Sequence, residues 1–122
     1  MDLNRVTLIG NLTRDPELKK IPGGQSVARF ALATNYRWED SDKAKRESVE
    51  FHDVVALGKL AEIIGVYVKL GSKVYVEGHL RARSTKGKDG TSRNHTEIVA
   101  DNLIMLGHRR KREIRLVPKE DQ

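Results

Sequence analysis

The sequence predicts an all-β domain with one short helix, folded as a small closed barrel. Five long segments have the β-branched or alternating apolar residues that are typical of strands. Between the third and the fourth of them, one segment repeats its apolar residues with the spacing of a helix. This order of elements favours a barrel over a β-sandwich, which usually has about seven strands.

The first expected strand is Leu3–Leu12, which is apolar and β-branched. Gly10, near its end, predicts a bulge or a bend, because glycine interrupts the regular pattern of a strand. A second, short strand is expected over Glu17–Ile21. Turn signals flank it on both sides, at Asp15-Pro16 and at Pro22-Gly23-Gly24.

The next long strand is expected over Ser26–Tyr36, where side chains alternate between two faces. One face carries Ala28, Phe30, Leu32 and Thr34. The strongly charged segment Trp38–Glu47 is then expected to form a polar loop, and Ser48–Leu57 the third long strand. On this strand, alternation places four residues on one face: Phe51, Asp53, Val55 and Leu57.

The segment Gly58–Leu70 has helical periodicity. Its apolar residues fall at i, i+3, i+4 and i+7, which is one face of a helix. These residues are Leu60, Ile63, Ile64 and Tyr67. Gly71 is expected to end the helix, because glycine tolerates the left-handed conformation that is common at that point. We expect this helix to plug one end of the barrel.

The last two long strands are expected over Lys73–Arg83 and His95–Leu106. Ser84–Arg93 is the expected hairpin tip between them, with Asp89-Gly90 as its strongest turn signal. Three strands, one helix and two further strands form the order of the five-stranded oligonucleotide-binding (OB) barrel. We therefore expect that barrel over residues 1–107, followed by a short basic C-terminal tail over residues 108–122.

The charge of the chain favours an anionic partner. Its 122 residues suit one domain with a single core. With 23 Lys and Arg against 17 Asp and Glu, the formal net charge is +6. This charge favours nucleic acid ahead of a membrane surface, and solubility alone is the alternative explanation.

Several kinds of site are excluded or disfavoured. The chain has no cysteine, which excludes a disulfide scaffold and a thiolate zinc site. The four histidines lie far apart in sequence, so neither a metal nor a cofactor is expected. There is no secretory signal and no apolar run long enough to span a bilayer, so a cytoplasmic location is expected.

An enzyme is also disfavoured. Gly58-Lys59 is similar to part of a phosphate-binding loop, but Leu60 replaces the Ser or Thr that the loop needs. Alternation places Glu50 and Asp53 on opposite faces of their strand, so these two carboxylates cannot share a substrate. The expected activity is binding rather than catalysis.

Four segments resemble successive motifs of one known family, the bacterial-type single-stranded DNA-binding proteins (SSB). They are VTLIGNLTRDPEL, VARFALATN, FHDVVALGKLAE and KVYVEGHLRAR, and the resemblance extends over Leu3–Gly107. It implies an OB barrel, a homotetramer, and sequence-independent binding and protection of single-stranded DNA during replication, recombination and repair. It also implies a cytoplasmic, nucleoid-associated location.

The resemblance implies that Trp38 and Phe51 are stacking residues for bases. Every base has a π-face, so an aromatic ring can bind any sequence, and nearby cations can hold the phosphates. The alternative is that Trp38 packs over its own loop and that Phe51 is a core residue. Ten cations are candidates for phosphate contacts or are merely solvated: Arg37, Lys43, Lys45, Arg46, Lys59, Arg81, Arg83, Lys86, Lys88 and Arg93.

The chain also departs from the family pattern. Leu57 and Thr85 stand at or near positions where the family often has stacking aromatics, and Asp53 places an acid on the expected binding face. The acidic tip that recruits replication and repair proteins in the family is absent, which indicates either a truncated chain or a protein without that function. A tailless, primosomal-type relative that assembles proteins is therefore an alternative, and an RNA-binding barrel of the cold-shock type is a weaker one.

The resemblance further implies how the subunits meet. The first strand, Asn4–Gly10, is expected to pair between subunits, and Lys73–Gly78 is expected near a second interface. Tyr75 and Glu77 in that segment are either interface residues or ordinary residues of the sheet surface.

Overall fold

A computed structural model describes residues 1–108 of the chain. Beyond His108, the predicted basic tail lies outside the described residues. The elements in chain order are β1 (Val6–Leu12), β2 (Glu17–Lys20), β3 (Ser26–Glu39), β4 (Lys45–Leu57), α1 (Lys59–Tyr67), β5 (Ser72–Lys86) and β6 (Ser92–His108).

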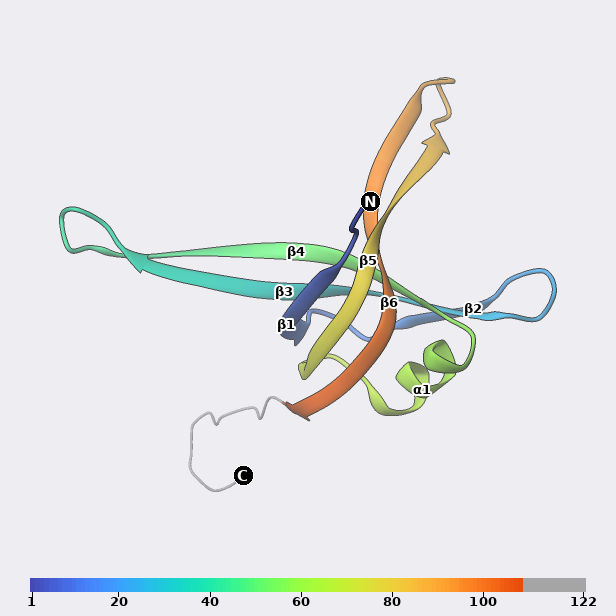
Figure 1. The fold of residues 1–122 in the computed structure, drawn as a ribbon, viewed down its shortest axis with the longest axis horizontal. Coiled ribbons are helices and arrows are strands. Elements are labelled where there is room, and N and C mark those ends of the chain that lie inside the picture. The colour runs from blue at the N-terminus through green and yellow to red at the C-terminus, as the bar shows by residue number, and fades with distance from the viewer. Residues whose placement is uncertain (109–122) are drawn as a thin grey trace.

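The strands form one sheet that closes on itself. Their order is β1-β5-β6-β4-β3-β2, and a further pairing of β1 with β3 closes a ring of five strands. The short β2 pairs with β3 outside this ring. β4 pairs with β6 in parallel, whereas the other pairs are antiparallel. The structure confirms the predicted OB barrel, with α1 lying beside one end of it (Figure 1).

Two glycines allow the strands to approach closely where the barrel curves. A Cβ atom on Gly10 would collide with the carbonyl oxygen of Ala33, at the point where β1 passes from β5 to β3. The register of β1 against β5 is continuous through Gly10, so this glycine marks a bend and not a bulge. A Cβ on Gly78 would collide in the same way with the carbonyl oxygen of Val99, beside a register shift between β5 and β6.

The core lies inside the ring, and strand alternation fills it. Phe30 and Leu32, which share one face of β3, are buried. Val54 of β4 and Val74 and Val76 of β5 pack in the same cluster. Burying one such side chain stabilises the fold by about 1.5–3 kcal/mol.

The predicted apolar face of α1 is partly wrong. Ile64 and Ala61 are fully buried, whereas Ile63 and Tyr67 are exposed. The helix turns its small Ala61 toward the sheet, which allows a close approach. The prediction that Gly71 ends the helix is also wrong, because α1 ends at Tyr67, and Gly71 lies in the turn before β5 with φ of 87°.

The expected polar loop Trp38–Glu47 is instead a hairpin. β3 and β4 pair continuously out to Glu39 and Lys45, and the turn occupies only the residues between them. Opposite charges face each other across the two strands, as in Arg37 opposite Glu47, and such pairs stabilise a sheet. The many charged residues of this segment led to the prediction of a loop. In the structure they belong to two paired strands that are exposed to solvent.

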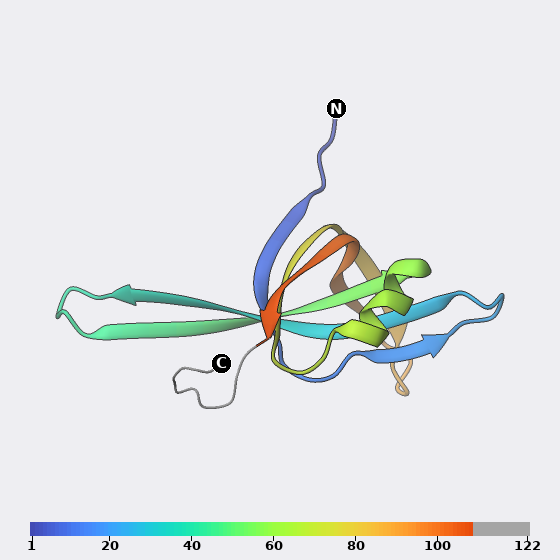
Figure 2. The same cartoon turned by 90° about the horizontal axis from the view of Figure 1, so that it is seen from below.

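The β3–β4 hairpin projects far from the barrel (Figures 1 and 2). We call residues 33–51 the β3–β4 arm. The Asp40 carboxylate holds its turn, because one oxygen accepts hydrogen bonds of 3.0 Å from the backbone N–H groups of Asp42 and Ala44. Lys43 in this turn has a φ of 63°, a conformation that favours glycine.

A second hairpin, β5–β6, projects in another direction (Figure 1). Its strands pair out to Lys86 and Ser92, so the expected tip Ser84–Arg93 is too long. The predicted turn at Asp89-Gly90 is confirmed, with φ of 85° at Gly90. Within residues 1–108, no helix has the length and the apolar character that crossing a bilayer requires.

Candidate nucleic-acid interface

The two aromatic residues expected to stack bases both lie exposed on the β3–β4 arm. The exposed fraction is 41% for Trp38 and 67% for Phe51. Trp38 lies opposite Arg46, and Phe51 lies opposite Ala33. Alternation along β3 therefore places Trp38 and Phe51 on opposite faces of the hairpin.

A third aromatic residue of the arm, Tyr36, was missed at the level of the sequence. Its ring stacks on that of Trp38, with centroids 5.5 Å apart and planes inclined by 26°. The signal available in the sequence was the i, i+2 spacing of Tyr36 and Trp38, which places two side chains on one face of a strand. The prediction of a loop after Tyr36 concealed it.

The arginines of the arm are paired with acids of the same hairpin. Arg37 lies 3.2 Å from a carboxylate oxygen of Glu47, and Arg46 lies 2.8 Å from Asp40. The hydrogen bond from Arg46, followed by that from the Ala44 N–H, lowers the pKa of the Asp40 carboxyl. A surface hollow of about 400 Å³ lies beside Trp38 and is also lined by Lys45.

A buried carboxylate organises the base of the β5–β6 hairpin. Glu97 is only 4% exposed, and one of its oxygens accepts a 3.0 Å hydrogen bond from Arg29 on β3. The other oxygen binds the guanidinium group of Arg81, and Arg83 lies 3.9 Å away. Burial raises the pKa of the Glu97 carboxyl, but the hydrogen bonds from Arg81 and Arg29 outweigh burial and lower it overall.

Beside Glu97 lies a hollow of about 270 Å³ between the hairpin base and the β3–β4 sheet. Besides Arg29 and Arg83, it is lined by Arg14, His95 and Asp53. Asp53 thus lies among several basic side chains, which reduces the repulsion that an isolated acid would exert on a phosphate. Arg14, Arg29 and His95 were not predicted as site residues. Arg14 and Arg29 lie within the segments that resemble the family, but the resemblance assigned them no role.

The remaining predicted cations lie apart from these clusters. Lys86 is in the last pair of β5–β6 and Arg93 in the pair before it, and Lys88 lies in the turn. Lys59 is the first residue of α1, and Lys43 lies in the turn of the arm. Within residues 1–108, the ion pairs involve none of these five residues.

The packing around Leu57 explains why this position does not need an aromatic residue. Leu57 lies against Val27, Val55 and Val99, which form a small second cluster outside the barrel core. Val55 shares a face with Phe51 but is fully buried there. Thr85 belongs to neither hydrophobic cluster. It is part-buried at the edge of the hollow beside Glu97.

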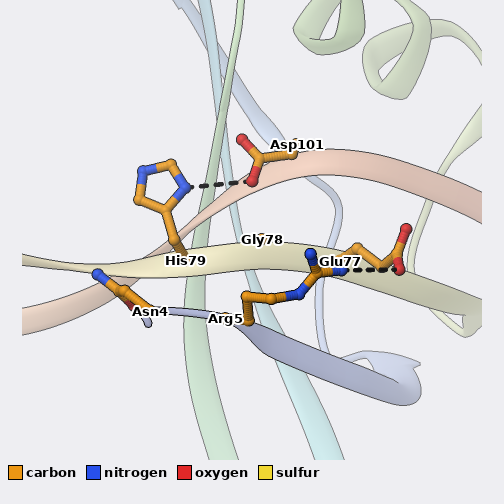
Figure 3. Close-up of a pocket in the computed structure, with 6 residues that line it drawn as sticks. All are labelled: Asn4, Arg5, Glu77, Gly78, His79 and Asp101. Atoms are coloured by element: carbon orange, nitrogen blue, oxygen red, sulfur yellow. Dashed lines mark hydrogen bonds and ion pairs between the residues drawn. The ribbon is translucent and has the colours of Figure 1, made fainter. Parts of the chain in front are cut away.

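A further hollow, of about 420 Å³, lies between the N-terminal segment, β5 and β6 (Figure 3). Arg5 and Glu77 approach within 3.8 Å there, and His79 and Asp101 within 3.2 Å. Its basic groups are balanced by acids, and it contains none of the predicted DNA-binding residues. Within the described part of the chain, no group of three or more His, Asp or Glu side chains could hold a metal ion.

Comparison with known proteins gives a consistent result. Two curated relatives, the single-stranded DNA-binding proteins of Neisseria meningitidis serogroups A and B, are each 45% identical over 109 residues. The match covers 89% of this chain and 63% of each relative, so the chain spans less than two thirds of their length.

Two solved structures have the same fold. The SSB of Plasmodium falciparum in complex with ssDNA has a TM-score of 0.79 at 32% identity, over 87% of this chain and 96% of that one. A deletion mutant of the single-stranded DNA binding protein from Thermus aquaticus has a TM-score of 0.75 at 32% identity, over 91% of this chain and 52% of that one. Residues 3–106 match the single-strand binding protein family, and the chain belongs to that family.

Proposed function

We propose that this protein binds single-stranded DNA without sequence preference, by stacking bases on exposed aromatics and holding phosphates with cations. The observation that carries the proposal is the β3–β4 arm, where Trp38 and Phe51 are exposed amid charged residues. Each stacked base contributes about 1–3 kcal/mol, whatever its identity. The similar Plasmodium falciparum protein, solved with ssDNA, supports this choice of ligand.

Two groups of cations supply the electrostatic part of binding. Lys86, Lys88 and Arg93 extend along the β5–β6 hairpin, and Arg14 and Arg83 line the hollow at its base. Neutralising phosphates releases counterions, so binding weakens as salt rises. The protein acts by binding rather than by catalysis, and it protects single strands in replication, recombination and repair, in the cytoplasm and the nucleoid.

The proposed assembly is a homotetramer. Among the described residues, Val6–Gly10 pair only with β5, which leaves one edge of β1 open to a second subunit. The outer face of β1, β5 and β6 also exposes Ile9, Ile104 and Leu106. Tyr75 lies on this face, and its hydrogen bond with Glu77 raises the pKa of the Tyr75 hydroxyl. Native mass spectrometry at micromolar concentration should give the tetramer, and a monomer would contradict it.

Fluorescence titration tests the binding. Trp38 is the only tryptophan, so its emission reports on one site. Oligo(dT) should quench the emission, whereas duplex DNA should compete poorly because its bases are already stacked. Binding detected by anisotropy without any change in emission would contradict stacking on Trp38. Equal affinity for a matched RNA strand would favour the cold-shock type of function instead.

A further inference from the structure

The face of β3 that builds the barrel core continues outward along the arm. Phe30 and Leu32 are buried at 2% and 0% exposure, and Thr34 is part-buried. The next two residues of this face, Tyr36 and Trp38, are 65% and 41% exposed. Both side chains therefore lie at the surface of the arm, outside the core cluster that contains Phe30 and Leu32. Two large aromatic side chains side by side at the surface form an apolar patch of the kind that marks a binding site.

The geometry of the two rings leaves room for bases. Tyr36 and Trp38 stack at 5.5 Å between centroids, so each ring covers one face of the other. Because both side chains stay exposed in this arrangement, a base that stacks on the pair would extend the same aromatic stack. Ser48 lies opposite Tyr36, and its small side chain leaves the tyrosine ring uncovered. Arg46 lies opposite Trp38, and its guanidinium group is held 2.8 Å from the Asp40 carboxylate.

We propose that Tyr36 is a further base-stacking residue, which forms one continuous aromatic platform with Trp38. The inference rests on the proposed function, because stacking requires a single strand along the arm. It offsets in part the absence of aromatics at Leu57 and Thr85. The hydroxyl group has no part in this role, so the ring alone should be required.

The test compares three substitutions of Tyr36 on two ligands. Tyr36→Ala should weaken binding of oligo(dT) at least about fivefold, the lower end of the effect of one stacked base. Tyr36→Phe should bind like the unmodified protein. Tyr36→Leu keeps an apolar contact with Trp38 but loses the aromatic ring, so it should also weaken binding at least about fivefold. It provides the test if the alanine variant folds poorly. On an abasic oligonucleotide of equal length, all three variants should bind like the unmodified protein.

Two controls make each outcome decisive. Tyr67→Ala removes a tyrosine of similar exposure on α1, away from the arm, and should change nothing. Trp38→Ala tests the proposed function itself. If Trp38→Ala weakens binding but Tyr36→Ala and Tyr36→Leu do not, the inference is wrong and the proposed function stands. If neither residue matters while DNA still binds, the strand does not follow the arm and both proposals fail. An equal loss in Tyr36→Phe and Tyr36→Ala would assign the effect to the hydroxyl group and overturn stacking.

Discussion

The β3–β4 arm and the β5–β6 hairpin both project from the barrel, but their side chains differ (Figure 1). The arm exposes Tyr36, Trp38 and Phe51. The β5–β6 hairpin has no aromatic residue between His79 and Glu97. It carries instead a row of lysines and arginines toward its tip.

The charges of the two hairpins are also used differently. On the arm, Arg37 and Arg46 are paired with acids of the same hairpin. Toward the tip of β5–β6, Lys86, Lys88 and Arg93 have no part in the ion pairs found within residues 1–108. We therefore expect stacking to come mainly from the arm and the salt-dependent part of binding mainly from β5–β6. The two contributions can then be separated by substitution.

The largest effect is expected from the arm. Trp38→Ala should reduce the free energy of binding by about 1–3 kcal/mol, because one stacking ring is lost. The slope of log K against log salt should hardly change, since no phosphate contact is removed. Anisotropy titrations of labelled oligo(dT) at four salt concentrations measure both quantities. Trp38→Phe is the matched control and should retain most of the affinity. A flatter salt slope in Trp38→Ala would contradict the assignment of the salt-dependent part of binding to β5–β6.

Removing cations from the β5–β6 hairpin should change the salt dependence of binding and leave the stacking on Trp38 unchanged. The triple variant Lys86→Gln, Lys88→Gln, Arg93→Gln should flatten the salt slope by about 2, because each phosphate neutralised on a single strand contributes about 0.7. The quenching of Trp38 at saturation should be unchanged. Lys69→Gln, an exposed site after α1, is the control. An unchanged slope in the triple variant would show that these cations are only solvated.

An aromatic residue added to the β5–β6 hairpin should give this hairpin a stacking contribution like that of the arm. Thr85→Trp is expected to increase affinity by about 1 kcal/mol without altering the salt slope, because Thr85 is part-buried beside Arg83 and has room for a ring at the hollow. Leu57→Phe should gain less, since Leu57 already packs against Val27, Val55 and Val99. Fluorescence of Thr85→Trp in a Trp38→Phe background tests whether DNA reaches position 85. No response of this tryptophan to saturating DNA would contradict the placement.

The smallest effect concerns pH and the base of the β5–β6 hairpin. The pKa of the Glu97 carboxyl is lower in the folded protein than its ordinary value of 4.5, through the hydrogen bonds from Arg81 and Arg29 that outweigh burial. Its contribution to stability is therefore complete above that ordinary value and is lost as pH falls through the folded-state pKa. Thermal unfolding between pH 7 and pH 3 should show a steeper loss for the unmodified protein than for Glu97→Gln. Identical pH profiles would contradict this role of Glu97.

Much of the fold follows from local patterns in the sequence. Alternation in Ser26–Tyr36 and Ser48–Leu57 predicted two strands and placed Phe30 and Leu32 on one face, because successive side chains of a strand point to opposite faces. The spacing of apolar residues after Gly58 predicted a helix, and the Asp89-Gly90 pair predicted a turn. Both are local patterns, and the structure contains both elements. The exposure of Trp38 followed from its charged neighbours, and the expectation that it stacks bases came from the resemblance.

The tertiary structure alone decided which of these residues meet. Arg29 and Glu97 are 68 residues apart, and only the closure of the barrel brings them within a hydrogen bond. The register of β3 against β4 turned a predicted loop into an arm and placed Trp38 and Phe51 on opposite faces. Each of these features depends on how distant strands pair. Local patterns define which face of a strand is apolar, but they do not define its partner or the length over which the two strands stay together.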